Sequence, residues 1–176
     1  MKEKYYVDII LTNDAKISLC LETKYAKKTV ENFINLVKEK YYDGTIFHRI
    51  IDNFMIQTGG YIVKDNYLLE MEEKNSIEGE FASNGHPENT LKHELGVISM
   101  ARTNDKNSAS TQFFICAADC GWLDGEYAAF GRIIDQASLD VVIATSKVET
   151  GNLGPGFTDF PRELIGIKTI NLVGEE

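Results

Sequence analysis

One arginine and one glutamine lie close together in a segment that is otherwise strongly apolar. Arg49 and Gln57 belong to residues 47–60, which read FHRIIDNFMIQTGG. An arginine is permanently charged and is rarely found among hydrophobic side chains without a reason. Because strand side chains alternate between two faces, we expect Arg49 and Gln57 on two adjacent strands joined by a turn at residues 52–53. A cation and an amide beside large hydrophobes would form a pocket for an apolar ligand that carries a carbonyl group.

The sequence lacks the common signatures of other catalytic chemistries. His93-Glu94 begins like a zinc-protease motif, but Val97 stands where the second zinc ligand is needed. His48, His86 and His93 show no metal-ligand spacing with one another or with the cysteines. Neither a G-x-S-x-G elbow nor a G-x-x-x-x-G-K-[ST] phosphate loop is present. We therefore expect no metal site and no cofactor.

Two further segments combine polar and aromatic residues. In Gln112-Phe113-Phe114, alternation predicts that Phe113 packs in the core and that Phe114 shares a face with Gln112, where it could line a pocket. Trp122 falls in a turn between two glycines, where a purely structural tryptophan is less expected, so we interpret it as a recognition residue. Taken singly, the phenylalanines are better explained by core packing.

Short strands are expected to position these residues. Apart from residues 47–57, patterns typical of strands occupy residues 6–11, 17–21, 96–101, 111–117, 127–134 and 167–173. Helices are predicted at about residues 29–40, where apolar residues recur at helical spacing, and at about 138–144. Residues 61–87 predict a long surface loop region. Many short strands, two helices and no β-α-β rhythm favour a closed or nearly closed antiparallel barrel over a sandwich.

Length and composition predict one globular domain spanning residues 1–176. The hydrophobic fraction of 43% disfavours disorder. A net charge of −9 argues against a nucleic-acid partner, whose phosphates would be repelled. Three cysteines without a C-x-x-C pair suggest reduced thiols, and we find neither a signal peptide nor an apolar segment of membrane-spanning length. We therefore expect a cytoplasmic monomer with no membrane partner.

Four long motifs follow one another along the chain. They are F-H-R-I-I-x-x-F-M-I-Q at residues 47–57, L-K-H-x-x-G-V-I-S-M-A-R at 91–102, S-x-Q-F-F-I at 110–115 and W-L-D-G-x-x-A-A-F-G at 122–131. In these motifs and their order the chain resembles the cyclophilin family of peptidyl-prolyl cis-trans isomerases, in its single-domain bacterial form. The resemblance implies a mainly β fold, a closed eight-stranded antiparallel barrel capped by two helices. It also implies acceleration of cis/trans isomerisation at X–Pro bonds, which assists protein folding.

The resemblance also implies the residues of the site. Arg49 would be the catalytic arginine, and Gln57 would orient it. The substrate-binding residues would be Phe54, Met55, Phe114 and Leu123 around the proline ring, Ala101, Arg102 and Gln112 along the substrate backbone, and Trp122 and Tyr127. The implied partners are proline-containing peptides, unfolded or partly folded proteins, and a cyclosporin-type inhibitor, whose binding the Trp122 position governs in the family.

The chain departs from the family pattern at three places. Tyr127 stands where many members have a pocket histidine, and Arg102 stands where eukaryotic members often have asparagine. Thr58 replaces a glycine and Gly60 an acidic residue, just after the glutamine. We expect these changes to tune rate and specificity.

Two other functions stay open at this point. A cyclophilin-fold module could bind proline-containing segments without turnover, and Tyr127 is the feature that leaves this possibility. A barrel that carries a small ligand is the weaker alternative, because the motif residues form an open groove. His48 is expected on the opposite face from Arg49, so we interpret it as a framework residue rather than an acid or base.

Overall fold

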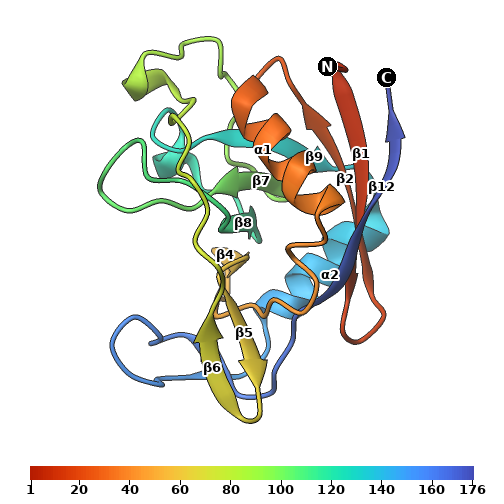
Figure 1. The fold of residues 1–176 in the computed structure, drawn as a ribbon, viewed down its shortest axis with the longest axis vertical. Coiled ribbons are helices and arrows are strands. Elements are labelled where there is room, and N and C mark those ends of the chain that lie inside the picture. Colours follow the sequence, from red (N-terminus) through yellow and green to blue (C-terminus); the bar gives the residue numbers. More distant parts are fainter.

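An eight-stranded antiparallel sheet forms most of the computed structural model, which describes residues 1–176. Its strands follow the spatial order β12-β1-β2-β9-β7-β8-β4-β3 (Figure 1). Their bounds are β1 (Lys4–Leu11), β2 (Lys16–Glu22), β3 (Arg49–Ile51), β4 (Met55–Thr58), β7 (Val97–Met100), β8 (Phe113–Cys116), β9 (Ala129–Ile133) and β12 (Ile167–Glu175). Every neighbouring pair is antiparallel, so the prediction of a mainly β, antiparallel fold is confirmed.

The two edges of this sheet are joined by only a few backbone hydrogen bonds. The segment before β3 meets the start of β12, where the Ile167 N–H donates to the Thr45 carbonyl over 2.7 Å and the Phe47 N–H donates to the Ile165 carbonyl over 2.9 Å. A single bridge between Ile46 and Gly166 is the only ladder element there. The expected closed barrel was therefore overstated: pairing at the seam is too short to make a ladder, and the sheet is a curled half-barrel.

Two α-helices pack against the curled sheet. Helix α1 (Lys27–Lys38) buries an apolar stripe that includes Val30, Phe33 and Val37. Helix α2 (Gln136–Ser146) begins at Asp135, whose carboxylate accepts a hydrogen bond from the Ser138 N–H. Both helices were predicted, with each end differing by two residues. Neither is long and apolar enough to cross a membrane.

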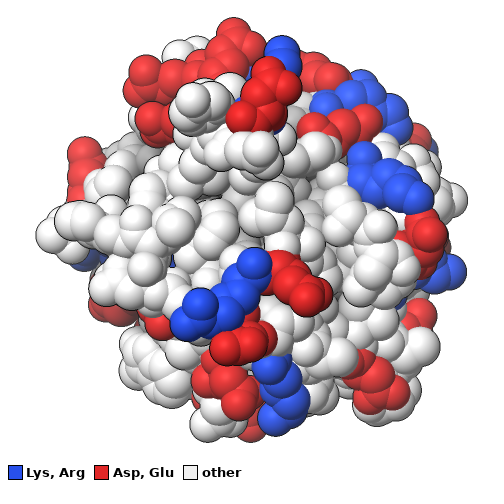
Figure 2. All heavy atoms as spheres, turned by 90° about the horizontal axis from the view of Figure 1, so that it is seen from below, with Lys and Arg blue, Asp and Glu red and all other residues white.

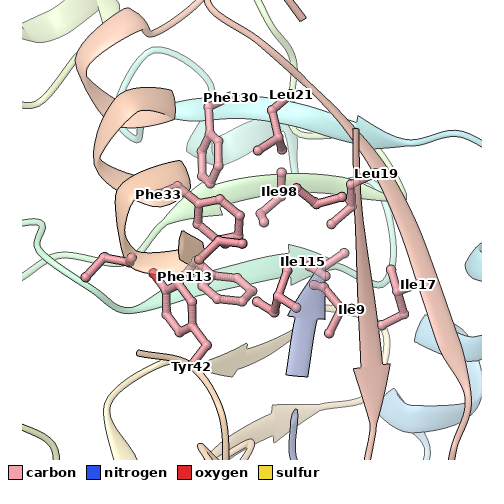
Figure 3. Close-up of a cluster of buried hydrophobic side chains, with 14 of the residues drawn as sticks. Ile9, Ile17, Leu19, Leu21, Phe33, Tyr42, Ile98, Phe113, Ile115 and Phe130 are labelled. Carbon is pink, nitrogen blue, oxygen red and sulfur yellow. The ribbon is translucent and has the colours of Figure 1, made fainter. Parts of the chain in front are cut away.

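The core fills the space between α1 and the sheet. Four aromatic rings meet there (Figure 3), with Phe33 placed 5.3 Å from Phe113 and 5.4 Å from Phe130 between ring centroids, and Tyr42 placed 5.2 Å from Phe113. Aliphatic side chains from the strands surround the rings and belong to the same cluster of 27 buried residues. Phe113 is fully buried in this cluster, as alternation in β8 predicted.

Residues 61–87 were expected to form a loop region, and that expectation was partly wrong. Strands β5 (Tyr61–Lys64) and β6 (Tyr67–Glu70) form a hairpin, because Asp65 and Asn66 adopt the positive φ angles that a tight two-residue turn requires. A 3₁₀ turn, η1 (Ala82–Asn84), follows.

The β5–β6 hairpin projects from the molecule beside the loop that carries β10 (Thr150–Gly151) and β11 (Phe160–Pro161) (Figure 1). Seen from that end, the surface shows acidic and basic side chains mixed together, with wide uncharged areas between them (Figure 2). The two hairpin strands pair only with each other and not with the eight-stranded sheet. The sequence therefore lacks the alternating apolar pattern that pairing with the main sheet would produce.

A side chain from the long 71–96 connection caps helix α1. The helix has no side-chain cap of its own at Ala26. Instead, the buried Glu80 accepts hydrogen bonds at Oε1 from the Thr29 N–H, over 2.6 Å, and from the Thr29 hydroxyl, over 2.7 Å. A carboxylate at a helix N-terminus also interacts favourably with the helix dipole.

We predict that Glu80→Ala lowers the free energy of unfolding by about 2 kcal/mol, because two buried donors lose their acceptor. Urea denaturation measures this loss. The control is Glu31→Ala, which removes an exposed glutamate from the same helix and should change stability by less than about 0.5 kcal/mol. Equal effects of the two substitutions would contradict the capping role.

Candidate active site

A row of four residues crosses the sheet from β3 to β7. Arg49 pairs with Gln57, Gln57 pairs with Phe114, and Phe114 pairs with Ser99. Residues that lie directly opposite one another in antiparallel strands share a face of the sheet. The register therefore places the cation, the amide and an aromatic ring side by side, as the sequence predicted for the first two.

The next row of the same four strands consists entirely of isoleucines. These residues are fully or almost fully buried in the core: Ile50, Ile56, Ile115 and Ile98. Side chains in adjacent rows point to opposite faces. The polar row consequently lies on the outer face of the half-barrel, while the isoleucine row helps to fill its interior.

A cavity of about 210 Å³ opens beside this polar row. Nine of the eleven predicted site residues line it: Arg49, Phe54, Met55, Gln57, Ala101, Arg102, Phe114, Leu123 and Tyr127. Two further lining residues, His48 and Gly156, were not predicted. The other two predicted residues, Gln112 and Trp122, lie next to the cavity and contact residues that line it.

The guanidinium of Arg49 is exposed and is held from one side. Its Nη1 donates a hydrogen bond to Gln57 Oε1 over 3.3 Å, and Gln57 Nε2 donates to Gln112 Oε1 over 2.9 Å. The Arg49 Cζ also lies 5.9 Å from the centre of the Phe54 ring. This chain of amides fixes the direction of the guanidinium while leaving N–H donors free for a ligand.

Gly60, one of the departures from the family pattern, gives the Gln112 side chain its room. A Cβ at this position would come within 2.7 Å of Gln112 Cδ. Any larger residue would therefore displace the amide that orients Gln57. The other departure in this segment, Thr58, is buried and donates a hydrogen bond to the Ile46 carbonyl at the seam of the half-barrel.

Apolar side chains form the walls of the cavity. Met55, Phe114 and Leu123 are buried, and Tyr127 meets the Phe114 ring edge to face at 6.0 Å. Leu123 is positioned by the 3₁₀ turn η2 (Gly121–Leu123). Met55, Phe114 and Leu123 belong to one buried cluster, and Phe54, Ala101 and Tyr127 pack against it.

Trp122 stands at the rim rather than in the wall. The residue is 65% exposed, and the centre of its ring lies 5.5 Å from that of Phe54. An exposed tryptophan against another aromatic ring offers a flat apolar surface to a ligand.

Arg102 and Tyr127, the two other departures, contact each other. The Arg102 Cζ lies 4.6 Å from the centre of the Tyr127 ring and 5.0 Å from that of Phe81. Its Nε and Nη2 both donate to the Glu126 carbonyl, over 3.1 and 2.7 Å. The arginine is thus fixed between two rings, and it holds the tyrosine against the cavity.

A second, larger cavity of about 770 Å³ continues from the first. The two share Gln57, Ala101 and Arg102, and Gln112 lines only the larger one. The glutamates at positions 70, 72 and 73 form part of its wall. The two cavities together make a groove longer than one residue, which suits an extended peptide.

His48, which was interpreted as a framework residue, is buried and also borders the cavity. It is 95% buried, yet it lines the cavity beside Arg49, and its Nδ1 has no hydrogen-bond partner. Its ring lies against those of Tyr61, at 4.7 Å, and Phe157, at 6.3 Å. Burial and the charge of Arg49 lower the pKa of His48 to about 4, so it is neutral at physiological pH. Gly156 carries no local sequence signal for this position, because the 150–161 loop reaches the site only through the tertiary fold.

Comparison with known proteins agrees with this geometry. The model of the family described as cyclophilin type peptidyl-prolyl cis-trans isomerase/CLD matches residues 6–172. Peptidyl-prolyl cis-trans isomerase A of Dickeya dadantii is 35% identical over 170 residues, which cover 94% of this chain and 83% of the relative. A peptidyl-prolyl cis-trans isomerase of Streptomyces antibioticus is 36% identical, with 93% of this chain and 96% of the relative covered. The chain belongs to the cyclophilin family of peptidyl-prolyl cis-trans isomerases.

The fold also matches solved structures. A cyclophilin type peptidyl-prolyl cis-trans isomerase from Cryptosporidium parvum superposes with a TM-score of 0.76 at 27% identity, and the match covers 98% of this chain and 99% of that one. A second crystal structure of that protein was obtained in the presence of the dipeptide Ala-Pro.

We predict that His48 makes the protein less stable as the pH falls. The folded pKa of about 4 lies below the unfolded value of about 6.5, so only the unfolded state gains this proton as pH falls through that window. The free energy of unfolding should fall by up to about 3 kcal/mol near pH 4 through this group. In urea denaturation, the stability of His48→Gln should therefore decline less steeply with falling pH than that of the parent.

His86→Gln is the control with the opposite sign. Hydrogen bonds with Glu88 and Glu78 raise the pKa of His86, so its stabilising contribution is present at low pH and is lost as pH rises. Removing it should steepen the acid decline. Identical pH dependence in the parent and His48→Gln would contradict the prediction.

Proposed function

We propose that Arg49 is the catalytic group of this cyclophilin and that the 210 Å³ cavity holds the proline ring of an X–Pro segment. The observation that carries the proposal is the exposed guanidinium, held by Gln57 at the edge of an apolar cavity that is walled by Met55, Phe114 and Leu123. The chain thereby accelerates the cis/trans isomerisation of prolyl bonds.

The chemistry requires no nucleophile. Rotation about an amide bond is opposed by a barrier of about 18–20 kcal/mol, because the nitrogen lone pair is delocalised into the carbonyl. In the twisted transition state the prolyl nitrogen becomes pyramidal and can accept a hydrogen bond. An arginine stays protonated in proteins, so Arg49 can donate to that nitrogen without proton transfer. The cavity binds the proline ring, and the groove past Gln112 binds the preceding residue. The two sides of the X–Pro bond then rotate relative to each other.

The required stabilisation is modest. Shortening the uncatalysed timescale of tens of seconds to about a millisecond is four to five decades, or roughly 6 kcal/mol of barrier. A charge-assisted hydrogen bond to the transition state supplies part of this, and holding the ligand in the reactive orientation supplies more. Substrate that covers Arg49 also removes water from the guanidinium and strengthens its interaction.

The partners follow from the shape of the site. The groove is lined mainly by polar side chains, namely amides, hydroxyls and charged groups, together with small residues. We infer that it accepts proline-containing segments of unfolded or partly folded proteins. The Ala-Pro dipeptide used with the Cryptosporidium parvum relative supports this class of ligand. We further infer a monomer that works in the cytoplasm, which agrees with the three free, buried thiols. A ligand-carrying barrel is disfavoured because packed side chains fill the interior.

We predict that Arg49→Ala lowers kcat/KM on an Ala-Pro peptide by at least about 100-fold, because the transition state loses its charged donor. A coupled-protease or NMR exchange assay measures this. Arg49 is exposed and outside the core, so the urea midpoint should stay close to that of the parent.

Arg49→Lys is the matched variant, since it keeps the charge but loses the fork that Gln57 orients. It should recover only a small part of the rate. If Arg49→Ala turned over at the parent rate, the assigned mechanism would be wrong. A parent that binds the peptide without accelerating exchange would instead support the binding module that Tyr127 leaves open.

We predict that a cyclosporin-type inhibitor changes the fluorescence of Trp122, because it is the only tryptophan and lies exposed at the rim. The titration should saturate and should compete with the Ala-Pro peptide. Trp122→Phe removes the signal, so its affinity is measured by loss of isomerase activity. No fluorescence change and no inhibition in the parent would remove this expectation.

A further inference from the structure

His93, the histidine of the second sequence motif, is buried behind the active site, and its ring and backbone N–H make three polar contacts. It is only 1% exposed. Its backbone N–H donates to Asp124 Oδ1 over 2.6 Å, its ring Nδ1 lies 3.1 Å from the same oxygen, and its Nε2 lies 2.8 Å from the hydroxyl of Ser99. The cavity lining does not include His93, so it has no direct contact with a ligand there.

The chemistry of the partners decides where the protons lie. A carboxylate only accepts, so Nδ1 carries the proton and donates it to Asp124. Nε2 then accepts the Ser99 hydroxyl proton, and each of the three side chains is satisfied with a neutral ring. Burial lowers the pKa of His93 and favours this neutral form.

Each side of the imidazole is connected to a wall of the cavity. Asp124 directly follows Leu123, at the end of η2, and its carboxylate fastens that turn to the histidine. The face of the imidazole lies nearly parallel to the Phe114 ring, at 18° and 6.0 Å between centroids. Ser99, the third member, pairs with Phe114 across β7 and β8. One buried side chain thus touches the supports of two walls that come from separate segments.

We propose that His93 is a positioning residue for isomerisation, which sets the orientation of Phe114 and the place of Leu123 through its bonds to Ser99 and Asp124. The inference rests on the proposed function of the cavity. A side chain that fixes both walls preserves the width of the slot that receives the proline ring. Displacement of a wall by a fraction of an ångström is enough to lower turnover without unfolding the protein.

The test is a double-mutant cycle between His93→Phe and Phe114→Leu. Phenylalanine keeps an aromatic ring but lacks both ring nitrogens. We expect His93→Phe to lower kcat/KM on an Ala-Pro peptide by about tenfold, at a temperature where the variant is fully folded. In the Phe114→Leu background the same change should cost clearly less than tenfold, because one of the two walls that His93 positions is already altered.

Two matched variants separate positioning from stability. His93→Asn retains a donor near Nδ1 for Asp124 and should recover part of the rate. His86→Phe makes the same replacement at a partly buried histidine outside the site and should leave kcat/KM within about twofold. A lower melting temperature for His93→Phe with unchanged kcat/KM, or equal losses in the two backgrounds of the cycle, would overturn the proposal.

The cycle is also read on the Kd for the peptide, measured by NMR titration. A parent that binds the peptide without accelerating exchange would contradict the proposed function. In that case, coupling between the two substitutions in Kd would still support the role of His93. Additive effects on Kd would contradict the role of His93. The two failures are therefore distinguishable.

Discussion

The register of three strand pairs is the constraint on which the site depends. Because β3, β4, β8 and β7 are aligned so that Arg49, Gln57, Phe114 and Ser99 form one row, the donor, its orienting amide and the aromatic wall stand side by side. A shift of one residue in any pair would turn a polar side chain toward the core and an isoleucine toward the groove. Core packing therefore enforces the geometry of the site: the isoleucine row is stable only in the register that assembles the polar row.

Loops supply the part of the cavity wall that the strand row does not provide. The strands supply the guanidinium and one wall, while the opposite wall comes from Leu123 and Tyr127, which follow β8 in an irregular segment. Loops are intrinsically more variable than strands, so this wall needs separate supports. Arg102, held between two rings, and Asp124, bonded to a buried histidine, provide them. The departures from the family pattern at Arg102 and Tyr127 belong to one contact rather than to two independent changes.

Alternation predicted most of the strands, because a half-buried strand records in its own sequence which face is covered. The division of labour between Phe113 and Phe114 is the clearest case. The nine residues around the cavity were implied by the motifs that resemble the cyclophilin family. Features that depend on distant segments were missed. Nothing local marks Glu80 as the cap of a helix some fifty positions earlier, or Gly156 as a cavity residue. The closed barrel was overestimated for the same reason, since the length of the seam depends on how two remote segments approach.

The pairing of β1 with β12 has a consequence for synthesis. β1 is the first strand of the sheet in chain order and β12 is the last, so one edge of β1 stays unpaired until translation has passed residue 175. An open strand edge is a site for unwanted association with other chains. The side chains at the alternating buried positions of β1 are also exposed during this time, which favours such association. The same long-range pairing that completes the sheet thus leaves one edge of β1 exposed in the nascent chain until the final strand has been made.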